Sequence, residues 1–204
     1  VAQYGGSVFE CEPTLEAREE EAERIGQETG AVFIHPSNDP GVMLGQGTAA
    51  LELLEDVDAL DHIVAPVGGG GLLGGTALAS VFFGGHCEPI GAEPLVVDDA
   101  YRSLKAGRIL GNESTDTIAD GLKTVLGSYT FPVIQQHVRT IIRVTEDEII
   151  QAMHLIWERM KIVVEPSSAV ALAAVFKDPE RFKGKRVGIV ISGGNVDLAN
   201  LPFD

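Results

Sequence analysis

The stretch that decides the fold is Val64-Ala65-Pro66-Val67-Gly68-Gly69-Gly70-Gly71-Leu72-Leu73, in which four successive glycines join two apolar runs. The first run, at 62–67, is typical of a strand covered on both faces in a parallel sheet. The second, at 72–83, has the length and composition of a buried helix. The glycines predict a tight turn whose backbone N–H groups converge on one point. The positive end of the helix lies at the same point, so the turn suits a phosphate.

A flexible turn without a ligand is the plainer interpretation of this stretch. Four glycines in succession at the carboxyl end of a buried strand favour an anion site over it. No lysine follows the glycines as in a Walker loop. The turn therefore predicts a phosphate but does not identify the compound.

Strand and helix patterns alternate along the rest of the chain. We expect strands at 6–11, 31–34, 62–67, 87–92, 140–144 and 187–191. We expect helices at 14–28, 39–57, 72–83, 98–104, 145–161 and 168–176. Helix starts are indicated by Thr14, by Asp39-Pro40 and by a capping box of Thr145 and Glu148. The alternation predicts an α/β fold with an open parallel sheet and helices on both faces. The first two strands are expected to belong to a separate lobe.

Composition narrows the class of protein. The chain has 204 residues, 45% of them hydrophobic, which is enough for one large core. Its 30 acidic and 15 basic residues give a formal charge of −15, which disfavours nucleic acid and anionic membranes as partners. The apolar stretch 62–86 is long enough to span a bilayer, but its eight glycines favour a strand, a loop and a helix. The two cysteines, Cys11 and Cys87, indicate no disulfide framework and a reducing, cytoplasmic setting.

Two further segments carry candidate chemistry. Ser192 follows the last predicted strand and precedes Gly193-Gly194, so it falls on the same sheet edge as the four glycines. A turn or helix-capping serine is the plainer interpretation of this residue. Glu93 and Asp99 flank Val97, and two carboxylates with one carbonyl form an all-oxygen set suited to Mg²⁺ or Ca²⁺. On spacing alone, a strand-end acid and a helix-capping aspartate are the favoured interpretation of these two residues.

Several motifs occur in order along the chain. They are His35-Pro36-x-x-Asp39-Pro40, Gly45-Gln46-Gly47-Thr48, the four glycines, Ala119-Asp120-Gly121, Val164-Glu165-Pro166-Ser167 and Ser192-Gly193-Gly194-Asn195. Together they resemble the motifs of fold-type II pyridoxal-phosphate enzymes, and within that group those of serine racemase and of threonine and hydroxyaspartate dehydratases. The resemblance implies part of a tryptophan synthase beta-like fold. Residues 1–38 would then be the C-terminal part of the small domain, and 39–204 most of the large cofactor-binding domain.

The resemblance also implies a role for individual residues. The backbone N–H groups of Gly68, Gly69, Gly70, Gly71 and Leu72 would hold the phosphate of pyridoxal 5'-phosphate. Ser192 would hydrogen-bond the pyridine nitrogen of the cofactor. Gly121 and Glu165 resemble residues that line the cofactor ring. Residues implied as ligands of a magnesium or calcium ion are Glu93, the Val97 carbonyl and Asp99. A neutral hydroxyl stabilises a protonated pyridine less than a carboxylate would, which fits reactions whose carbanion is short-lived.

Such enzymes attach the cofactor to a lysine in a Ser-Phe-Lys-x-Arg-Gly-type segment, and no lysine of this chain has those neighbours. We therefore expect no catalytic residue within the chain. The implied activity is loss of the β-hydroxyl from serine, threonine or a similar hydroxy amino acid to give the keto acid and ammonia, racemisation of that substrate, or both. A homodimer is expected. The alternative is that this chain alone is a non-catalytic cofactor-binding fragment.

Overall fold

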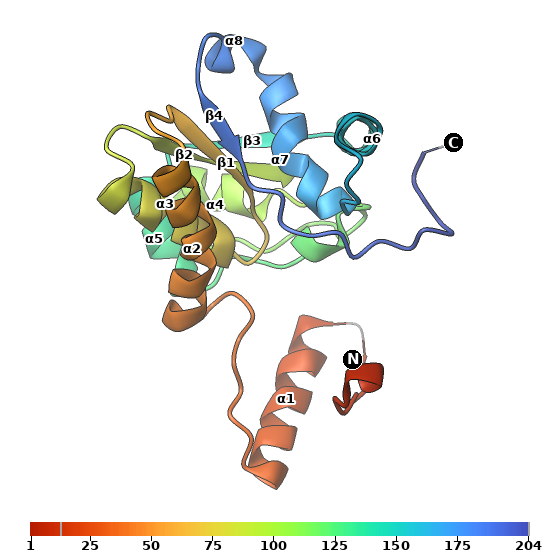
Figure 1. Cartoon of the computed structure of the whole chain (residues 1–204). Coiled ribbons are helices and arrows are strands. Elements are labelled where there is room, and N and C mark those ends of the chain that lie inside the picture. Colours follow the sequence, from red (N-terminus) through yellow and green to blue (C-terminus); the bar gives the residue numbers. More distant parts are fainter. Residues whose placement is uncertain (13, 204) are drawn as a thin grey trace. The chain divides into compact units, whose positions relative to one another are not determined.

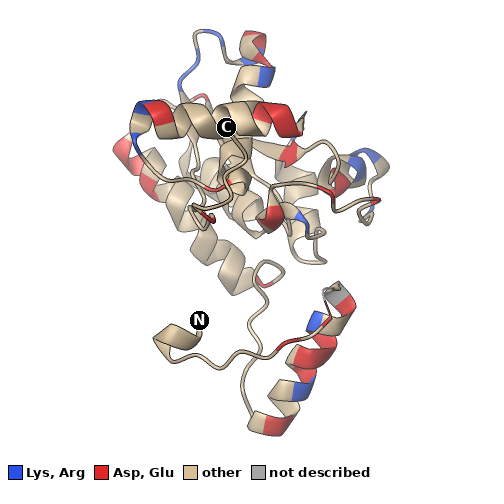
Figure 2. Ribbon diagram, turned by 90° about the vertical axis from the view of Figure 1, so that its right-hand side faces the viewer, with Lys and Arg blue, Asp and Glu red and all other residues tan. Residues whose placement is uncertain are grey.

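The computed structural model describes residues 1–12 and 14–203, which form two compact units, Val1–His35 and Pro36–Asp204 (Figure 1). The first unit contains a 3₁₀ turn, η1 (Ala2–Tyr4), and helix α1 (Leu15–Thr29). The predicted cap of α1 is confirmed, because Thr14 Oγ1 accepts a hydrogen bond from Ala17 N at 3.1 Å. Gly30 closes the helix in the left-handed region, with φ of 73°. Acidic side chains recur along α1, as Figure 2 shows.

The two strands predicted in the first unit are wrong. Residues 6–11 and 31–34 form no strand in the described part of the chain. Their apolar side chains are exposed, with Val8 at 60% and Val32 at 85%. An apolar run becomes a strand only when a neighbouring strand completes its backbone hydrogen bonds, and no described residue does so here.

The second unit is built on a sheet of parallel strands in the order β3-β2-β1-β4. The strands are β1 (His62–Pro66), β2 (Glu88–Pro94), β3 (Thr140–Val144) and β4 (Val187–Ile189). In the central register, Val64 lies opposite Ile90 on one side and Ile189 on the other. The predicted parallel sheet is therefore confirmed, with β4 shorter than the run at 187–191 suggested.

Helices cover both faces of this sheet, as expected (Figure 1). Their bounds are α2 (Pro40–Asp56), α3 (Gly71–Phe83), α4 (Asp99–Ala106), η2 (Asp120–Leu122), α5 (Thr130–His137), α6 (Glu146–Met160), α7 (Pro166–Lys177) and α8 (Pro179–Phe182). Side chains alternate along β1: Val64 packs in the core beneath α6 and α7, and Ala65 packs with Leu73 of α3 on the other face. The sequence analysis missed α5, because Pro132 interrupts its pattern, although proline is tolerated in a first helical turn.

Among the described residues, no helix is long and apolar enough to cross a membrane. The run at 62–86, which had the length of a membrane span, divides into β1, the glycine turn, α3 and a short turn. Helices α2 and α3 pack so closely that backbone meets backbone, since a methyl group on Gly47 would lie 2.8 Å from Gly75 O. That close approach fixes where α3 begins.

The chain changes direction at β1. After β1 it moves through α3 to β2 and then to β3, and it returns on the other side of β1 to form β4. The loops that leave β1 and β4 therefore diverge from adjacent strands at the carboxyl edge of the sheet. In open α/β sheets, ligands bind in the crevice at this kind of topological switch point. The glycine turn follows β1 and Ser192 follows β4, so both border the crevice.

Candidate functional site

The glycine turn is shaped for close approach of a ligand to the backbone. Gly70 is the residue before α3 and has φ of 86°, a conformation that favours glycine. No side chain caps α3, so the free N–H groups of its first turn are available at its positive end. A methyl group on Gly70 would lie 2.7 Å from Leu126 Cδ2 and 2.8 Å from Ile134 Cδ1. The turn therefore has glycine here because both the conformation and the space require it.

A threonine that the sequence analysis did not single out holds this turn. Thr130 Oγ1 donates a buried hydrogen bond to Gly69 O at 2.8 Å and accepts one from Gly127 N at 2.9 Å. In a planar trans peptide, the carbonyl and the following N–H point in opposite directions. Fixing Gly69 O toward Thr130 therefore directs the N–H of Gly70 away from α5. No local pattern in the sequence indicated this contact, because Thr130 lies sixty-one residues from Gly69.

The segment containing Gly121 lies against the glycine turn. A methyl group on Gly68 would lie 3.1 Å from Leu122 Cα and 3.2 Å from Gly121 O. Gly121 in turn donates its N–H to Ser167 Oγ at 3.0 Å, and a methyl group on it would lie 3.9 Å from Glu165 Oε1. The structure thus brings Gly68, Gly121 and Glu165 together, although the sequence separates them widely.

The loop after β4 is tied to the start of α7. Glu165 Oε2 accepts a hydrogen bond from Asn195 N at 2.8 Å, and Glu165 N donates to Gly193 O at 3.1 Å. Ser168 Oγ accepts from Ser192 N at 2.6 Å and from Gly193 N at 3.2 Å. The contacts consequently link the predicted residues Gly68, Gly121, Glu165 and Ser192 through the first turn of α7. Glu165 lies directly before α7, and its carboxylate also accepts a hydrogen bond from the loop at residues 190–196, called the serine loop.

These residues fit pyridoxal phosphate by their chemistry. The glycine turn offers backbone N–H groups at a helix terminus, which is the environment that a phosphate monoester prefers. Ser192 is exposed on the adjacent loop, and its hydroxyl is both a donor and an acceptor.

The predicted metal residues Glu93 and Asp99 lie at the end of β2 and the start of α4, and both are fully buried. Glu93 Oε1 accepts from Ala100 N at 2.9 Å and Oε2 from Tyr101 N at 3.0 Å. Asp99 Oδ2 accepts from Leu126 N at 3.1 Å, whereas its buried Oδ1 meets no donor at hydrogen-bond geometry in the described part of the chain, although the nearby Asn112 side chain lowers the pKa of Asp99. Val97, also buried, lies in the turn between them.

Electrostatics make this carboxylate pair unusual. Burial, and then the charge of Asp99, raise the pKa of Glu93 to about 9. Burial likewise raises the pKa of Asp99 to about 6. A divalent cation would neutralise two neighbouring buried carboxylates and would coordinate the unpartnered oxygen of Asp99. The residues therefore fit an ion with oxygen ligands. The described residues contain no group of three His, Cys, Asp or Glu side chains that could hold a metal. A cation at Glu93 and Asp99 would therefore need a further ligand, such as the Val97 carbonyl.

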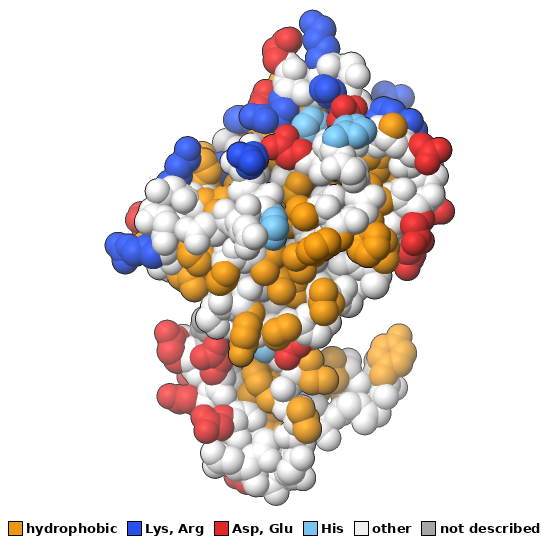
Figure 3. Space-filling model, turned by 90° about the vertical axis from the view of Figure 1, so that its left-hand side faces the viewer, with side chains coloured by type: hydrophobic (Ala, Val, Ile, Leu, Met, Phe, Trp, Pro, Cys, Tyr) orange, Lys and Arg blue, Asp and Glu red, His pale blue; other side chains and the backbone are white. Residues whose placement is uncertain are grey.

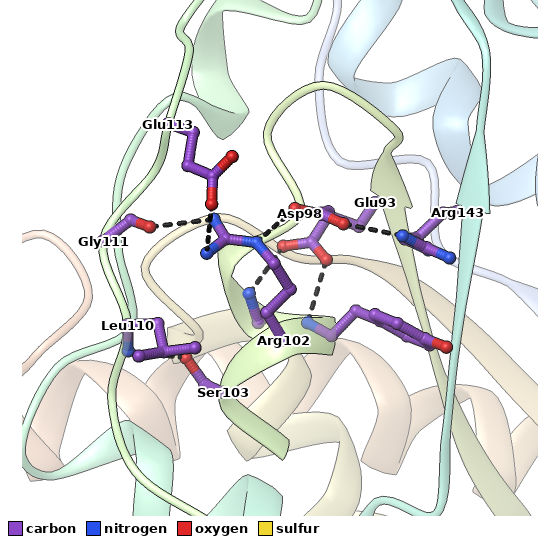
Figure 4. A network of polar contacts seen from close by, with 10 residues as sticks. Glu93, Asp98, Arg102, Ser103, Leu110, Gly111, Glu113 and Arg143 are labelled. Carbon is purple, nitrogen blue, oxygen red and sulfur yellow. Dashed lines mark hydrogen bonds and ion pairs between the residues drawn. The ribbon is translucent and has the colours of Figure 1, made fainter. Parts of the chain in front are cut away.

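An arginine network beside this pair holds α4 in place (Figure 4). Asp98 accepts from Arg102 Nε at 2.6 Å and from Arg143 Nη1 at 2.7 Å. Although burial opposes it, these two hydrogen bonds hold the pKa of Asp98 below its ordinary value. The Arg143 guanidinium also stacks 3.9 Å from the centre of the Tyr101 ring. The network joins β3 to α4 and thereby fixes the helix that carries Asp99.

Comparison with known proteins identifies the family. A family profile described as "Pyridoxal-phosphate dependent enzyme" matches residues 1–193. The chain belongs to this family. It is 50% identical to beta-hydroxyaspartate dehydratase from Paracoccus denitrificans (strain Pd 1222), over all of this chain and 65% of that protein. It is 49% identical to serine racemase from Dictyostelium discoideum, over 98% of this chain and 63% of that protein.

Solved structures support the fold of the family member. The crystal structure of a threonine deaminase from T.th. superposes with a TM-score of 0.91 at 42% identity, covering 97% of this chain and 66% of that one. The fold-type II assignment is therefore confirmed. The chain spans about two thirds or less of the length of these relatives.

Proposed function

We propose that the whole protein binds pyridoxal 5'-phosphate at the switch point and acts on a small hydroxy amino acid such as serine, threonine or hydroxyaspartate. The proposed reaction is elimination of water from the substrate, followed by hydrolysis that releases the keto acid and ammonia, with racemisation of the substrate at the same site. One observation carries the proposal: the glycine turn at the start of α3 and the Ser192 loop follow the adjacent strands β1 and β4 and are joined through Gly121 and Glu165. The relatives named above, a dehydratase and a racemase, support the reaction class.

In this proposal the chain's own residues bind and orient. Backbone N–H groups of Gly68, Gly69, Gly70, Gly71 and Leu72 would hold the phosphate, and Thr130 would keep the turn in position. Ser192 would hydrogen-bond the pyridine nitrogen, while Gly121 and Glu165 would border the ring. When bound, the cofactor supplies an electron sink for the substrate's Cα. Because Ser192 is neutral, it would leave that sink weaker than a carboxylate would.

The cofactor site is tested with a matched pair of glycine variants. Gly70→Ala places a methyl group against Leu126 and Ile134 at a residue with φ of 86°, so binding of pyridoxine 5'-phosphate should be lost. Gly85→Ala is the control, because Gly85 also has a positive φ, of 61°, but its methyl group would meet nothing within 4 Å. Fluorescence titration measures the affinity. Equal binding by the two variants would contradict the proposed site.

Activity and the fragment alternative require different experiments. The whole protein should release keto acid from at least one of serine, threonine and hydroxyaspartate, and chiral chromatography should detect any enantiomer formed. Release of none, with no enantiomer, would refute the proposed reaction. Borohydride reduction with the cofactor should label a lysine of the whole protein, whereas the 204-residue chain alone should show no specific label. Specific labelling of this chain would exclude the fragment alternative.

We also infer that Glu93, Asp99 and the Val97 carbonyl hold a divalent cation, Mg²⁺ or Ca²⁺. The unpartnered Oδ1 of Asp99 supports this proposal. Either ion should raise the melting temperature of chelator-treated protein, and Asp99→Asn should abolish that increase. The control is Asp147→Asn, a substitution at an exposed carboxylate on α6. An increase that survives in Asp99→Asn would place the cation elsewhere.

Domain assignment and assembly are proposals as well. We propose that residues 1–38 belong to the small domain and 39–204 to the large one, and that the whole protein is a homodimer. The side of the molecule seen in Figure 3 supports a partner, because hydrophobic side chains gather across it. An apolar hollow of about 230 Å³ lies between α2 and α3, and Phe82 and Phe83 beside it are 70% and 67% exposed. Phe82→Glu should shift the mass measured by light scattering toward the monomer; an unchanged dimer would exclude this face.

The setting of the protein is also proposed from its cysteines. Cys11 is exposed and Cys87 is buried, and both are free thiols. Burial raises the pKa of the Cys87 thiol, which keeps it in its less reactive form. Free thiols without a disulfide suit a reducing compartment, so we propose a cytoplasmic location. Fractionation of cells with an antibody to the protein tests this, and recovery outside the cytoplasm would contradict it.

A further inference from the structure

The first turn of α7 holds both loops that border the proposed cofactor ring. Ser167 Oγ accepts the N–H of Gly121, and Ser168 Oγ accepts the N–H groups of Ser192 and Gly193. Ser167 is 2% exposed and Ser168 is fully buried. Both hydroxyls therefore bind fixed backbone groups in the interior.

Ser168 is surrounded by an otherwise apolar helix face. Its neighbours along α7, Ala169, Val170 and Ala171, are fully buried. A hydroxyl buried among such side chains is unfavourable unless it is hydrogen-bonded. Here it accepts two hydrogen bonds from consecutive residues of one loop, at 2.6 and 3.2 Å. Both hydrogen bonds that Ser168 Oγ accepts thus come from the serine loop.

Ser168 is the group that holds the serine loop at Ser192 itself. Residues 190–196 lie outside regular secondary structure, and Glu165 holds the loop one and three residues further on, through Gly193 O and Asn195 N. The N–H of Ser192 donates to Ser168 Oγ, and this contact restrains the backbone from which the Ser192 hydroxyl takes one of the staggered rotamers of χ1. Without Ser168, the N–H groups of Ser192 and Gly193 would lose this acceptor, and the backbone at Ser192 could shift while Glu165 still held the rest of the loop.

We propose that Ser168 is a positioning residue that places the Ser192 hydroxyl for contact with the cofactor ring. This inference rests on the proposed function, because Ser192 is taken as the residue that meets the pyridine nitrogen. Ser168 itself would touch neither cofactor nor substrate. It would act through the backbone of Ser192, so its removal should affect recognition of the ring and spare recognition of the phosphate.

The experiment separates ring binding from phosphate binding. Pyridoxine 5'-phosphate carries the ring and the phosphate but no aldehyde, so its binding needs no lysine. In the whole protein, Ser168→Ala should weaken its affinity about tenfold, the effect expected when a single net hydrogen bond is lost. The ring absorption of the bound vitamer should shift toward that of the free compound. Affinity for inorganic phosphate should be unchanged, and Ser168→Thr, which keeps an Oγ, should restore the vitamer's affinity and spectrum.

Ser103→Ala is the matched control. Ser103 is also fully buried, and its Oγ accepts a backbone N–H from Leu110 at 2.9 Å (Figure 4), but this contact involves no residue of the serine loop. Ser103→Ala should lower the free energy of unfolding about as much as Ser168→Ala does, but it should leave the vitamer's affinity and spectrum unchanged. An equal loss in Ser103→Ala, or wild-type affinity and spectrum in Ser168→Ala, would overturn the proposal.

A measurement on the unaltered protein covers the case in which Ser168→Ala does not fold. The amides of Ser192 and Gly193 should exchange with deuterium more slowly than those of Leu198 and Leu201, for which the described residues provide no acceptor, because Ser168 holds them. Unprotected exchange at both sites would refute the inference. This test needs no cofactor. Absence of vitamer binding by the unaltered protein would instead refute the proposed function.

Discussion

Replacing Gly75 by alanine should destabilise the protein, because α2 and α3 meet there through their backbones. A methyl group on Gly75 would lie 2.5 Å from Gly47 N and 2.7 Å from Gly47 Cα, and it would also contact Met43 O. Ordinary contacts between such atoms are about 3.5–4.0 Å, so the two helices must separate by roughly 1 Å. Overpacking of this kind costs about 1–3 kcal/mol. Since α3 begins at the glycine turn, the proposed phosphate site would move with it.

Gly45→Ala on α2 is the control for this substitution. Gly45 is exposed, and a methyl group on it would meet nothing within 4 Å. Alanine is the better helix former, so this change should stabilise by about 0.5–1 kcal/mol. Urea unfolding of the two variants should show midpoints on opposite sides of the wild-type value, with unchanged slopes. The packing argument fails if Gly75→Ala is as stable as Gly45→Ala.

Two further predictions concern buried and partly buried acids. Because burial and Asp99 raise the pKa of Glu93 from 4.5 to about 9, the folded protein holds a proton that the unfolded chain releases. In chelator, the free energy of unfolding should therefore fall as pH rises between these values, by about 1.4 kcal/mol per pH unit from this group. Glu93→Gln should flatten that slope in urea titrations, and an equally steep slope would contradict the cause. Glu146 Oε2 accepts from Ile118 N at 2.8 Å, so Glu146→Gln should speed deuterium exchange of that amide while Asp147→Asn leaves it unchanged. Unaltered exchange in Glu146→Gln would show that this contact does not hold the loop.

Local signals predicted most elements of the second unit. The capping box of Thr145 and Glu148 is present with both of its hydrogen bonds, and Asp39 caps α2 through Val42 N. These devices act over three residues, so the sequence contains everything they need. The same is true of the four glycines, whose role depends mainly on adjacent residues. Family motifs extended the prediction to individual cofactor residues, several of which the structure links through contacts.

Tertiary structure decided what depends on distant partners. Apolar residues at 6–11 and 31–34 have strand composition but no neighbouring strand among the described residues, so their composition could not determine their conformation. The hold of Thr130 on Gly69 spans sixty-one residues, and that of Ser168 on Ser192 spans twenty-four. A hydroxyl's partner depends on which backbone groups the folded chain brings within about 3 Å, and no short-range pattern encodes that distance. The sequence by itself thus determined the parallel sheet, most of its helices and the loops proposed to bind the cofactor, whereas packing alone selected the residues that hold those loops.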